Sequence, residues 1–328
     1  MPMTTSAAEP LQGPNVAAVR IRPVSNPSYI PVRSSQLRYY IRVPLYHEPA
    51  PGVFQLYKPP GLEISELRMS EGMHPRLHIQ QRDRMTAATE VHKGFNVEIA
   101  RSIDTGDVSA VKSVLCDLVS ETLAEPRSGM LQALPGTIDI LVTGYSKQPG
   151  ILRTFATISN KDYTTVIHSI NVMALSLSFC FYSGLTLRET KRLGLAALLH
   201  DVGKSEIPSE ILQAPRKLST EEFEIMKSHP TIGDRLIRDI NRLGDDLAQG
   251  AREHHEKLDG SGYPKGLRKI SFNGQLIGII DCYEALTNED RPYRRAMDPL
   301  ETLNLLKRDV EAGKFDRGLF EKFCYSLI

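Results

Sequence analysis

Cysteine is scarce in this sequence of 328 residues. The four cysteines are far apart and lack any C-x-x-C spacing: Cys116, Cys180, Cys282 and Cys324. This argues against a disulfide framework and is typical of reduced thiols in a cytoplasmic protein. An excess of charge of one sign is also absent, because 40 Lys and Arg residues balance 39 Asp and Glu residues. We therefore expect no large nucleic-acid surface, although the balance is compatible with a local basic patch.

Two further absences concern location. The first residues, MPMTTSAAEPLQGP, contain neither the basic region nor the apolar region of a signal peptide. The most apolar stretch, Ile170 to Leu185, is interrupted by Asn171 and by three serines. It is too short and too polar for a bilayer span, which indicates a buried helix instead. These patterns predict a cytoplasmic protein with no membrane partner.

The composition changes along the chain and predicts four segments. Residues 1–25 are rich in Pro, Ala, Ser and Thr and are expected to be a disordered tail. Residues 26–90 are expected to form a β-rich domain, residues 91–150 a helical connecting or regulatory segment, and residues 151–328 an all-α domain. Short runs of β-forming residues broken by Pro and Gly predict the strands, at Tyr29–Val32, Leu37–Val43, Gly52–Tyr57 and Leu77–Gln80. The predicted fold class is multidomain α+β, with a small β-rich N-terminal domain followed by an all-α helical bundle.

Helix starts are clear in the second half. Thr186 with Glu189, and Ser219 with Glu222, have the spacing of a capping box, in which each residue satisfies a backbone N–H near the other. These boxes place one helix just before residue 200 and another before residue 229.

Histidines gather in the same half of the chain. Five of the nine follow residue 150, and each lies at or beside the end of an apolar segment, as do two aspartates: His168, His200, His229, His254, His255, Asp201 and Asp281. A lone histidine on an apolar helix is usually a hydrogen-bonded core residue, and adjacent His-Asp pairs arise by chance. Burying so many titratable groups together is costly without a cation, however, and mixed N and O ligands suit Mn, Fe or Zn. The combination predicts a shared metal site, whereas a surface or loop position is expected for His47, His74, His78 and His92.

Four segments carry a family resemblance: LLHDVGKSEIPSEIL, KSHPTIGDRLI, HHEKLDGSGYPKGL and DCYEALTNEDRPYRRAM. In this order they resemble the HD-GYP domain, the branch of the HD superfamily whose members hydrolyse the bacterial second messenger cyclic di-GMP. The upstream KDYTTVIHSINV is similar to the segment that supplies the first histidine ligand of the family. The resemblance covers roughly residues 150–328 and implies that residues 151–328 form an HD-type metallo-phosphohydrolase bundle.

The resemblance also implies a role for each matching position. Two divalent transition-metal ions would bind, with Fe or Mn favoured and Zn, Ni or Co as alternatives. Asp201 would bridge them, and the other ligands would be His168, His200, His229, His254, His255 and Asp281. Asp201 and Lys204 would be the catalytic residues, and the substrate would be bound by Lys204, Tyr263, Arg291 and Arg294.

Three departures from the family pattern limit what is carried over. Some members bind a third metal through a glutamate four residues before the first histidine, where this chain has Thr164. The nearest upstream acid, Asp162, is six residues away and would face another side of a helix, so we predict two metals. Glu284 replaces a more common aspartate, which we interpret as a tolerated change beside the site. Altered segment lengths before Asp281 and around Arg291 leave the substrate contacts there open.

Together these features predict a metal-dependent phosphodiesterase that hydrolyses cyclic di-GMP to pGpG, GMP or both. Two alternatives stay open: a catalytically weak sensor or scaffold that binds cyclic di-GMP and acts through partners, or a hydrolase for another cyclic dinucleotide or a nucleotide phosphomonoester. The substrate is the partner expected first. A homodimer or a signalling-protein partner is left open, and no nucleic-acid partner is expected.

Overall fold

The computed structural model describes residues 28–64, 72, 74–124, 126, 130–158, 164–288 and 296–328. Contacts divide the chain into two compact units, one up to Arg84 and one covering Met85–Ile328. The first unit contains a small antiparallel sheet and the second is helical, so the predicted fold class is confirmed. The tail expected to be disordered falls outside the described residues.

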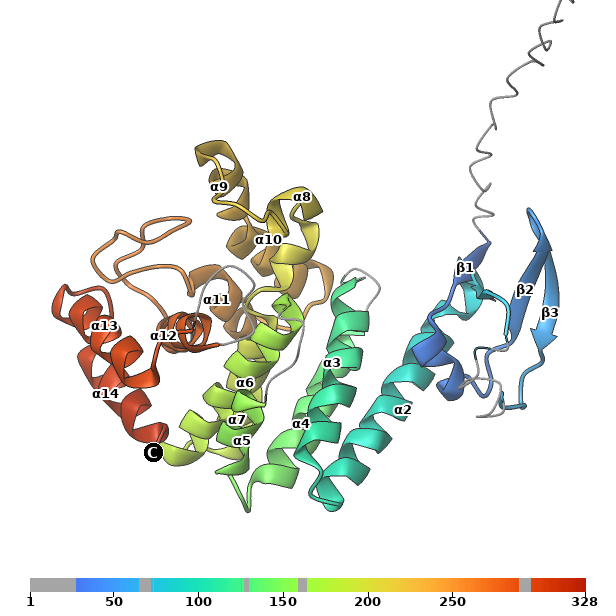
Figure 1. The fold of residues 1–328 in the computed structure, drawn as a ribbon, viewed down its shortest axis with the longest axis horizontal. Coiled ribbons are helices and arrows are strands. Elements are labelled where there is room, and N and C mark those ends of the chain that lie inside the picture. Colours follow the sequence, from blue (N-terminus) through green and yellow to red (C-terminus); the bar gives the residue numbers. More distant parts are fainter. Residues whose placement is uncertain are drawn as a thin grey trace, which may run out of the picture. The chain divides into compact units, whose positions relative to one another are not determined.

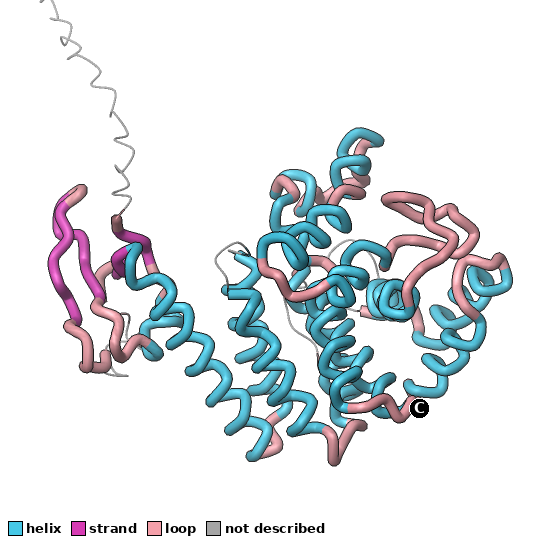
Figure 2. Tube along the Cα trace, turned by 180° about the vertical axis from the view of Figure 1, so that it is seen from behind, coloured by secondary structure: helices cyan, strands magenta, loops and turns pink. Residues whose placement is uncertain are grey.

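The sheet of the first unit has four strands, drawn in magenta in Figure 2. They are β1 (Tyr29–Pro31), β2 (Leu45–Ala50), β3 (Val53–Lys58) and β4 (Leu77–Gln80). Their order is β1-β4-β2-β3 and all pairings are antiparallel. Leu45, Leu77 and Ile79 are buried in this unit.

One predicted strand, Leu37–Val43, is wrong. Residues Ser34–Tyr39 form a 3₁₀ helix, and the strand lies further along, at β2. Leu37 and Val43 are nevertheless buried. A short apolar run reports burial but does not by itself separate a strand from a buried helical turn, which explains the error. The other three predicted strands are confirmed to within one residue at each end.

The second unit is built from helices (Figure 1). Their bounds are α2 (Arg84–Asp104), α3 (Val108–Ala124), α4 (Leu134–Tyr145), α5 (Ile151–Thr157), α6 (Thr165–Tyr182), α7 (Leu187–Leu199), α8 (Ser209–Leu212), α9 (Thr220–Met226), α10 (His229–Arg235), α11 (Asp245–Glu253), α12 (Phe272–Thr287), α13 (Pro299–Glu311) and α14 (Arg317–Ser326). Both predicted capping boxes are confirmed, at the starts of α7 and α9.

Helix α6 is the core of this unit and packs against α5, α7 and α12. Thr164 caps its first turn by accepting a hydrogen bond from the backbone N–H of Ile167. Among the described helices, α6 is the one long and apolar enough to cross a membrane, but 78% of that window is buried inside the protein. The expectation of a buried helix is therefore confirmed.

Candidate metal centre

Five helices bring the predicted ligands together. His168 lies in the first turn of α6, and His200 caps the end of α7, with Asp201 directly after it. The other ligands come from the start of α10, the end of α11 and the middle of α12: His229, His254, His255 and Asp281. All are buried except His255, whose side chain is 22% exposed.

The donor atoms form two groups that share one residue. Asp201 with His229, His254 and His255 makes the first, and His168 with His200 and Asp201 makes the second. Within each group, one ligand atom from every residue lies within 4.8 Å of the others. A carboxylate shared by two donor groups is the geometry needed to bridge two cations.

Asp281 lies beside both groups. Its Oδ1 is 2.9 Å from Nε2 of His168, and its Oδ2 is 3.9 Å from Nδ1 of His255. The structure therefore brings together all seven residues that the sequence predicts as ligands.

Three imidazoles are held by backbone carbonyl groups. Nδ1 of His200 lies 2.7 Å from the carbonyl oxygen of Ala197, and Nδ1 of His229 lies 2.8 Å from that of Met226. Nδ1 of His254 lies 2.9 Å from the carbonyl of residue 251. Because a carbonyl only accepts, each Nδ1 donates its proton and leaves Nε2 as a lone-pair donor.

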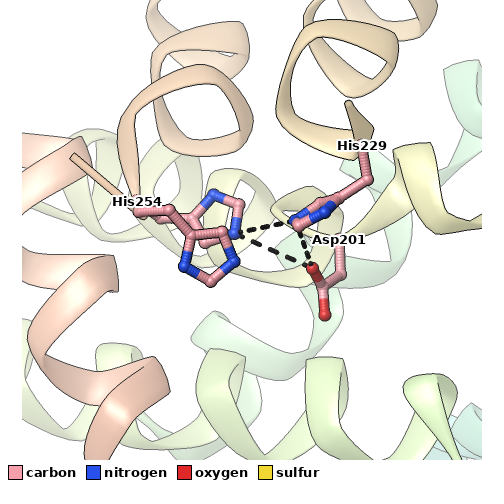
Figure 3. Close-up of side chains that lie close together, drawn as sticks. Asp201, His229 and His254 are labelled. Atoms are coloured by element: carbon pink, nitrogen blue, oxygen red, sulfur yellow. Dashed lines mark hydrogen bonds and ion pairs between the residues drawn. The ribbon is translucent and has the colours of Figure 1, made fainter. Parts of the chain in front are cut away.

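These free nitrogens converge on Asp201. Nε2 of His200, His229 and His254 lies 3.5, 3.3 and 3.7 Å from carboxylate oxygens of Asp201. Figure 3 shows His229 and His254 directed toward this carboxylate and toward each other. The rings are thus oriented as ligands by hydrogen bonds that their own helices supply.

His168 is held differently. Its Nδ1 lies 2.5 Å from Oε2 of Glu284, whose other oxygen accepts from the amides of Asn171 and Asn288. Glu284 is thus more than a tolerated replacement, and the sequence did not predict this contact. The available signal was the spacing of three residues from Asp281, which puts both carboxylates on one face of α12.

The electrostatics favour cation binding. Burial lowers the pKa of His255 to about 3 and that of His254 well below its usual value, so both rings are neutral near pH 7. Burial opposes ionisation of Asp201, but Lys204 and the nearby histidines outweigh it and hold the pKa of this carboxyl well below its usual range. For His168, burial is outweighed by the carboxylates of Glu284 and Asp281, which raise its pKa to about 9. This ring is therefore protonated near pH 7, and a cation would bind at Nε2 in place of the proton there.

Two buried polar atoms of the cluster fit a role as metal donors. Nε2 of His200 and Oδ1 of Asp201 have no hydrogen-bond partner among the described residues. Leaving such groups unpaired in the interior is costly. Neutral imidazoles with ionised carboxylates form the mixed donor set that first-row transition metals prefer. The residues present therefore fit a metal centre.

Two of the four predicted substrate-binding residues, Lys204 and Tyr263, lie at the metal cluster. Nζ of Lys204 donates to Oδ2 of Asp201 at 2.5 Å, and its side chain is 22% exposed. The Tyr263 ring stacks on His255 with centroids 4.5 Å apart, so both residues lie at the cluster. Arg291 and Arg294 fall outside the described residues, as does Asp162.

The surface or loop position expected for the remaining histidines is wrong for two of them. His78 on β4 and His92 on α2 are only 6% and 4% exposed. His92 shares a face of α2 with the buried Phe95 and Ile99, so the helical period explains its burial. His78 lies on the face of β4 opposite Leu77 and Ile79 and packs against the ring of Phe54, with centroids 5.1 Å apart.

Comparison with known proteins agrees with this geometry. Residues 151–319 match the family model described as HD domain, and the chain belongs to this family. The solved structure of Bd1817, an HDG"Y"P protein from Bdellovibrio bacteriovorus, superposes with a TM-score of 0.60 over 90% of this chain and 98% of that one, at 23% identity. The resemblance to HD-GYP proteins is confirmed, and this structural match bears on the fold alone.

Curated relatives are similar over part of the chain. The chain is 32% identical over 189 residues to cyclic di-GMP phosphodiesterase PA4108 of Pseudomonas aeruginosa, and 40% identical over 147 residues to a cyclic di-GMP phosphodiesterase of Thermotoga maritima. It is also 35% identical over 164 residues to 3'3'-cGAMP-specific phosphodiesterase 1 of Vibrio cholerae. These alignments cover 57%, 43% and 49% of this chain, and 45%, 39% and 37% of the respective relatives. The chain thus spans less than half the length of these relatives.

Proposed function

We propose that this protein is a metal-dependent phosphodiesterase that hydrolyses cyclic di-GMP to pGpG, GMP or both. The observation that carries the proposal is the pair of donor groups that share Asp201, with the Lys204 ammonium at the same carboxylate. Two of the relatives are named for hydrolysis of this substrate, which supports the assignment.

These residues would hold two Fe or Mn ions, which would supply a bound water of lowered pKa and neutralise phosphate oxygens, the two needs of phosphodiester hydrolysis near neutral pH. Zn, Ni and Co are the alternatives. A third ion is not expected, because the Thr164 hydroxyl is used to cap α6. The stoichiometry we propose is two per chain.

Side chains around the cluster would bind and orient the phosphodiester. The Lys204 ammonium, partly exposed beside Asp201, is placed to contact a non-bridging phosphate oxygen and to stabilise charge that develops there. Burial, together with the nearby carboxylates of Asp281 and Asp201, raises the pKa of Tyr263, so its phenol stays protonated and can donate a hydrogen bond. Arg291 and Arg294 stay predictions as further substrate contacts.

A second candidate substrate, 3'3'-cGAMP, is supported by one observation, the similarity to a 3'3'-cGAMP-specific enzyme.

To test the proposal, protein loaded with Mn²⁺ or Fe²⁺ is incubated with cyclic di-GMP, 3'3'-cGAMP and a nucleotide monoester, and the products are separated by chromatography. We expect cyclic di-GMP to be consumed by the wild type and spared by Asp201→Asn. Tight nucleotide binding without turnover would contradict the proposal and favour a sensor.

We also propose a cytoplasmic location and a connecting or regulatory role for residues 91–150. A homodimer or a signalling-protein partner stays open.

A further inference from the structure

The five histidines of the cluster do not have equivalent partners. Within hydrogen-bonding distance, the described partners of Nδ1 in His200, His229 and His254 are backbone carbonyl groups. At Nδ1 of His168 the partner is the carboxylate of Glu284. A carboxylate that accepts from a ligating imidazole fixes its tautomer and makes its other nitrogen a stronger donor than a neutral carbonyl does.

The Glu284 carboxylate is itself fixed in place. Its side chain is 4% exposed, and Oε1 accepts from the amides of Asn171 at 2.8 Å and Asn288 at 2.7 Å. With Oε1 used in this way, Oε2 is held toward His168. These three described partners can all donate, which an ionised carboxylate can satisfy because it only accepts.

The hydrogen bond from His168 to Glu284 affects only one of the two donor groups. His168 belongs to the group with His200 and Asp201, whereas the group of Asp201, His229, His254 and His255 does not contain it. We propose that Glu284 is a positioning residue that makes the two metal positions unequal, by holding His168 as a ligand in the group that His168 forms with His200 and Asp201. The inference rests on the proposed two-metal function. It adds that Glu284 strengthens metal binding at the position that includes His168.

Glutamine is the informative substitution. It has the shape of glutamate but only one acceptor oxygen, with an amide that donates. If its oxygen faces His168, its NH₂ meets the donating amides of Asn171 and Asn288. If it is reversed, the NH₂ faces Nδ1 and favours the tautomer with a proton on Nε2, which cannot ligate.

The effect of Glu284→Ala on metal binding would be harder to interpret. Glu284 and Asn288 also line a cavity of about 710 Å³ between α5, α12 and α13. Removing the side chain would open this cavity toward His168, and water could take over the hydrogen bond. Glu284→Gln avoids this, and Glu284→Asp keeps both acceptor oxygens on a side chain one methylene shorter.

The test is an isotherm of Mn²⁺ binding to the full chain, with free Mn²⁺ measured by electron paramagnetic resonance. We expect two ions per chain in the wild type. In Glu284→Gln we expect one position unchanged and the other weakened by about 10–100-fold, with Glu284→Asp recovering part of the loss. Glu121→Gln, a buried glutamate on α3, is the matched control and should keep both positions.

Proton NMR of the Zn²⁺-loaded protein gives a second measurement. The wild type should show a downfield imidazole N–H resonance from His168 that is lost in Glu284→Gln. Equal affinities in wild type and Glu284→Gln, equal weakening of both positions, or Glu284→Asp as defective as Glu284→Gln would each overturn the inference. A wild-type chain that binds no metal would instead overturn the proposed function.

Discussion

Gly203 packs so closely against the backbone of His229 that residue 203 has no room for a side chain. A Cβ built on Gly203 would fall 2.0 Å from the carbonyl oxygen of His229 and 2.6 Å from the backbone nitrogen of Gly233. Both neighbours are backbone atoms of α10, so neither can yield by rotating a side chain. The glycine after the His200-Asp201 pair thus lets the turn that follows α7 approach the helix that supplies the next ligand.

Gly203→Ala should therefore displace α10 and draw His229 away from Asp201. We expect a loss of unfolding free energy of about 1–3 kcal/mol, as for overpacking elsewhere, and weaker binding of the ion held by His229. Urea denaturation and an Mn²⁺ isotherm measure these two effects. Gly136→Ala in α4, whose Cβ would meet its nearest neighbour at 3.8 Å, is the control. It should leave metal binding unchanged and raise the unfolding free energy by at most about 1 kcal/mol. Unchanged metal binding in Gly203→Ala would show that the close contact does not position His229.

Lys204→Met should separate charge from metal binding. Methionine keeps most of the apolar stem but removes the ammonium at Asp201. We expect kcat for cyclic di-GMP to fall by about 10²–10³-fold, because charge on the reacting phosphate loses its partner, while two ions still bind. Steady-state kinetics and metal analysis provide the two measurements. Lys191→Met, which breaks the ion pair with Asp139, should leave kcat unchanged. Loss of metal from Lys204→Met would assign this lysine a structural role instead.

A buried lysine ties α3 to the end of α5. Lys112 is 1% exposed, and its Nζ donates to the carbonyl oxygens of Phe155 at 3.1 Å and Ile158 at 2.6 Å. Lys112→Met should leave these buried acceptors without that donor and lower the unfolding free energy by about 1–3 kcal/mol. Denaturant unfolding would detect this, and the exposed Lys93→Met should stay within about 0.5 kcal/mol of wild type. Equal stabilities for the two variants would contradict the assignment.

Cys180 should make stability fall at alkaline pH. Burial in α6 raises the pKa of this thiol from 9.0 to about 12, so it stays protonated in the folded state while the unfolded chain ionises above pH 9. Ionisation then favours the unfolded state, and the wild type should lose about 1 kcal/mol between pH 8 and pH 10 that Cys180→Ala does not lose. Parallel denaturation curves of the two proteins at both pH values measure this difference. Identical pH dependence would mean that the folded thiol ionises normally.

Much of the fold followed from local patterns. The capping boxes at Thr186 and Ser219 predicted helix starts correctly, since they depend on residues three apart in one turn. The apolar run in α6 also predicted a buried helix, because its length and its scattered polar residues are visible in the local sequence. The error at Leu37–Val43 arose because burial, which the run does encode, is shared by strands and buried 3₁₀ turns.

The sequence by itself determined which candidate ligands this protein has and their order along the chain, from His168 to Asp281. Residue identity is enough for this, because imidazole and carboxylate side chains are the usual metal donors. Only the tertiary structure decided how they are held. Glu284 contacts His168 across 116 residues of sequence, and no local spacing encodes a hydrogen bond between two helices. The orientation of each ring depends on such contacts, because the partner of one imidazole nitrogen decides whether the other is available to a metal.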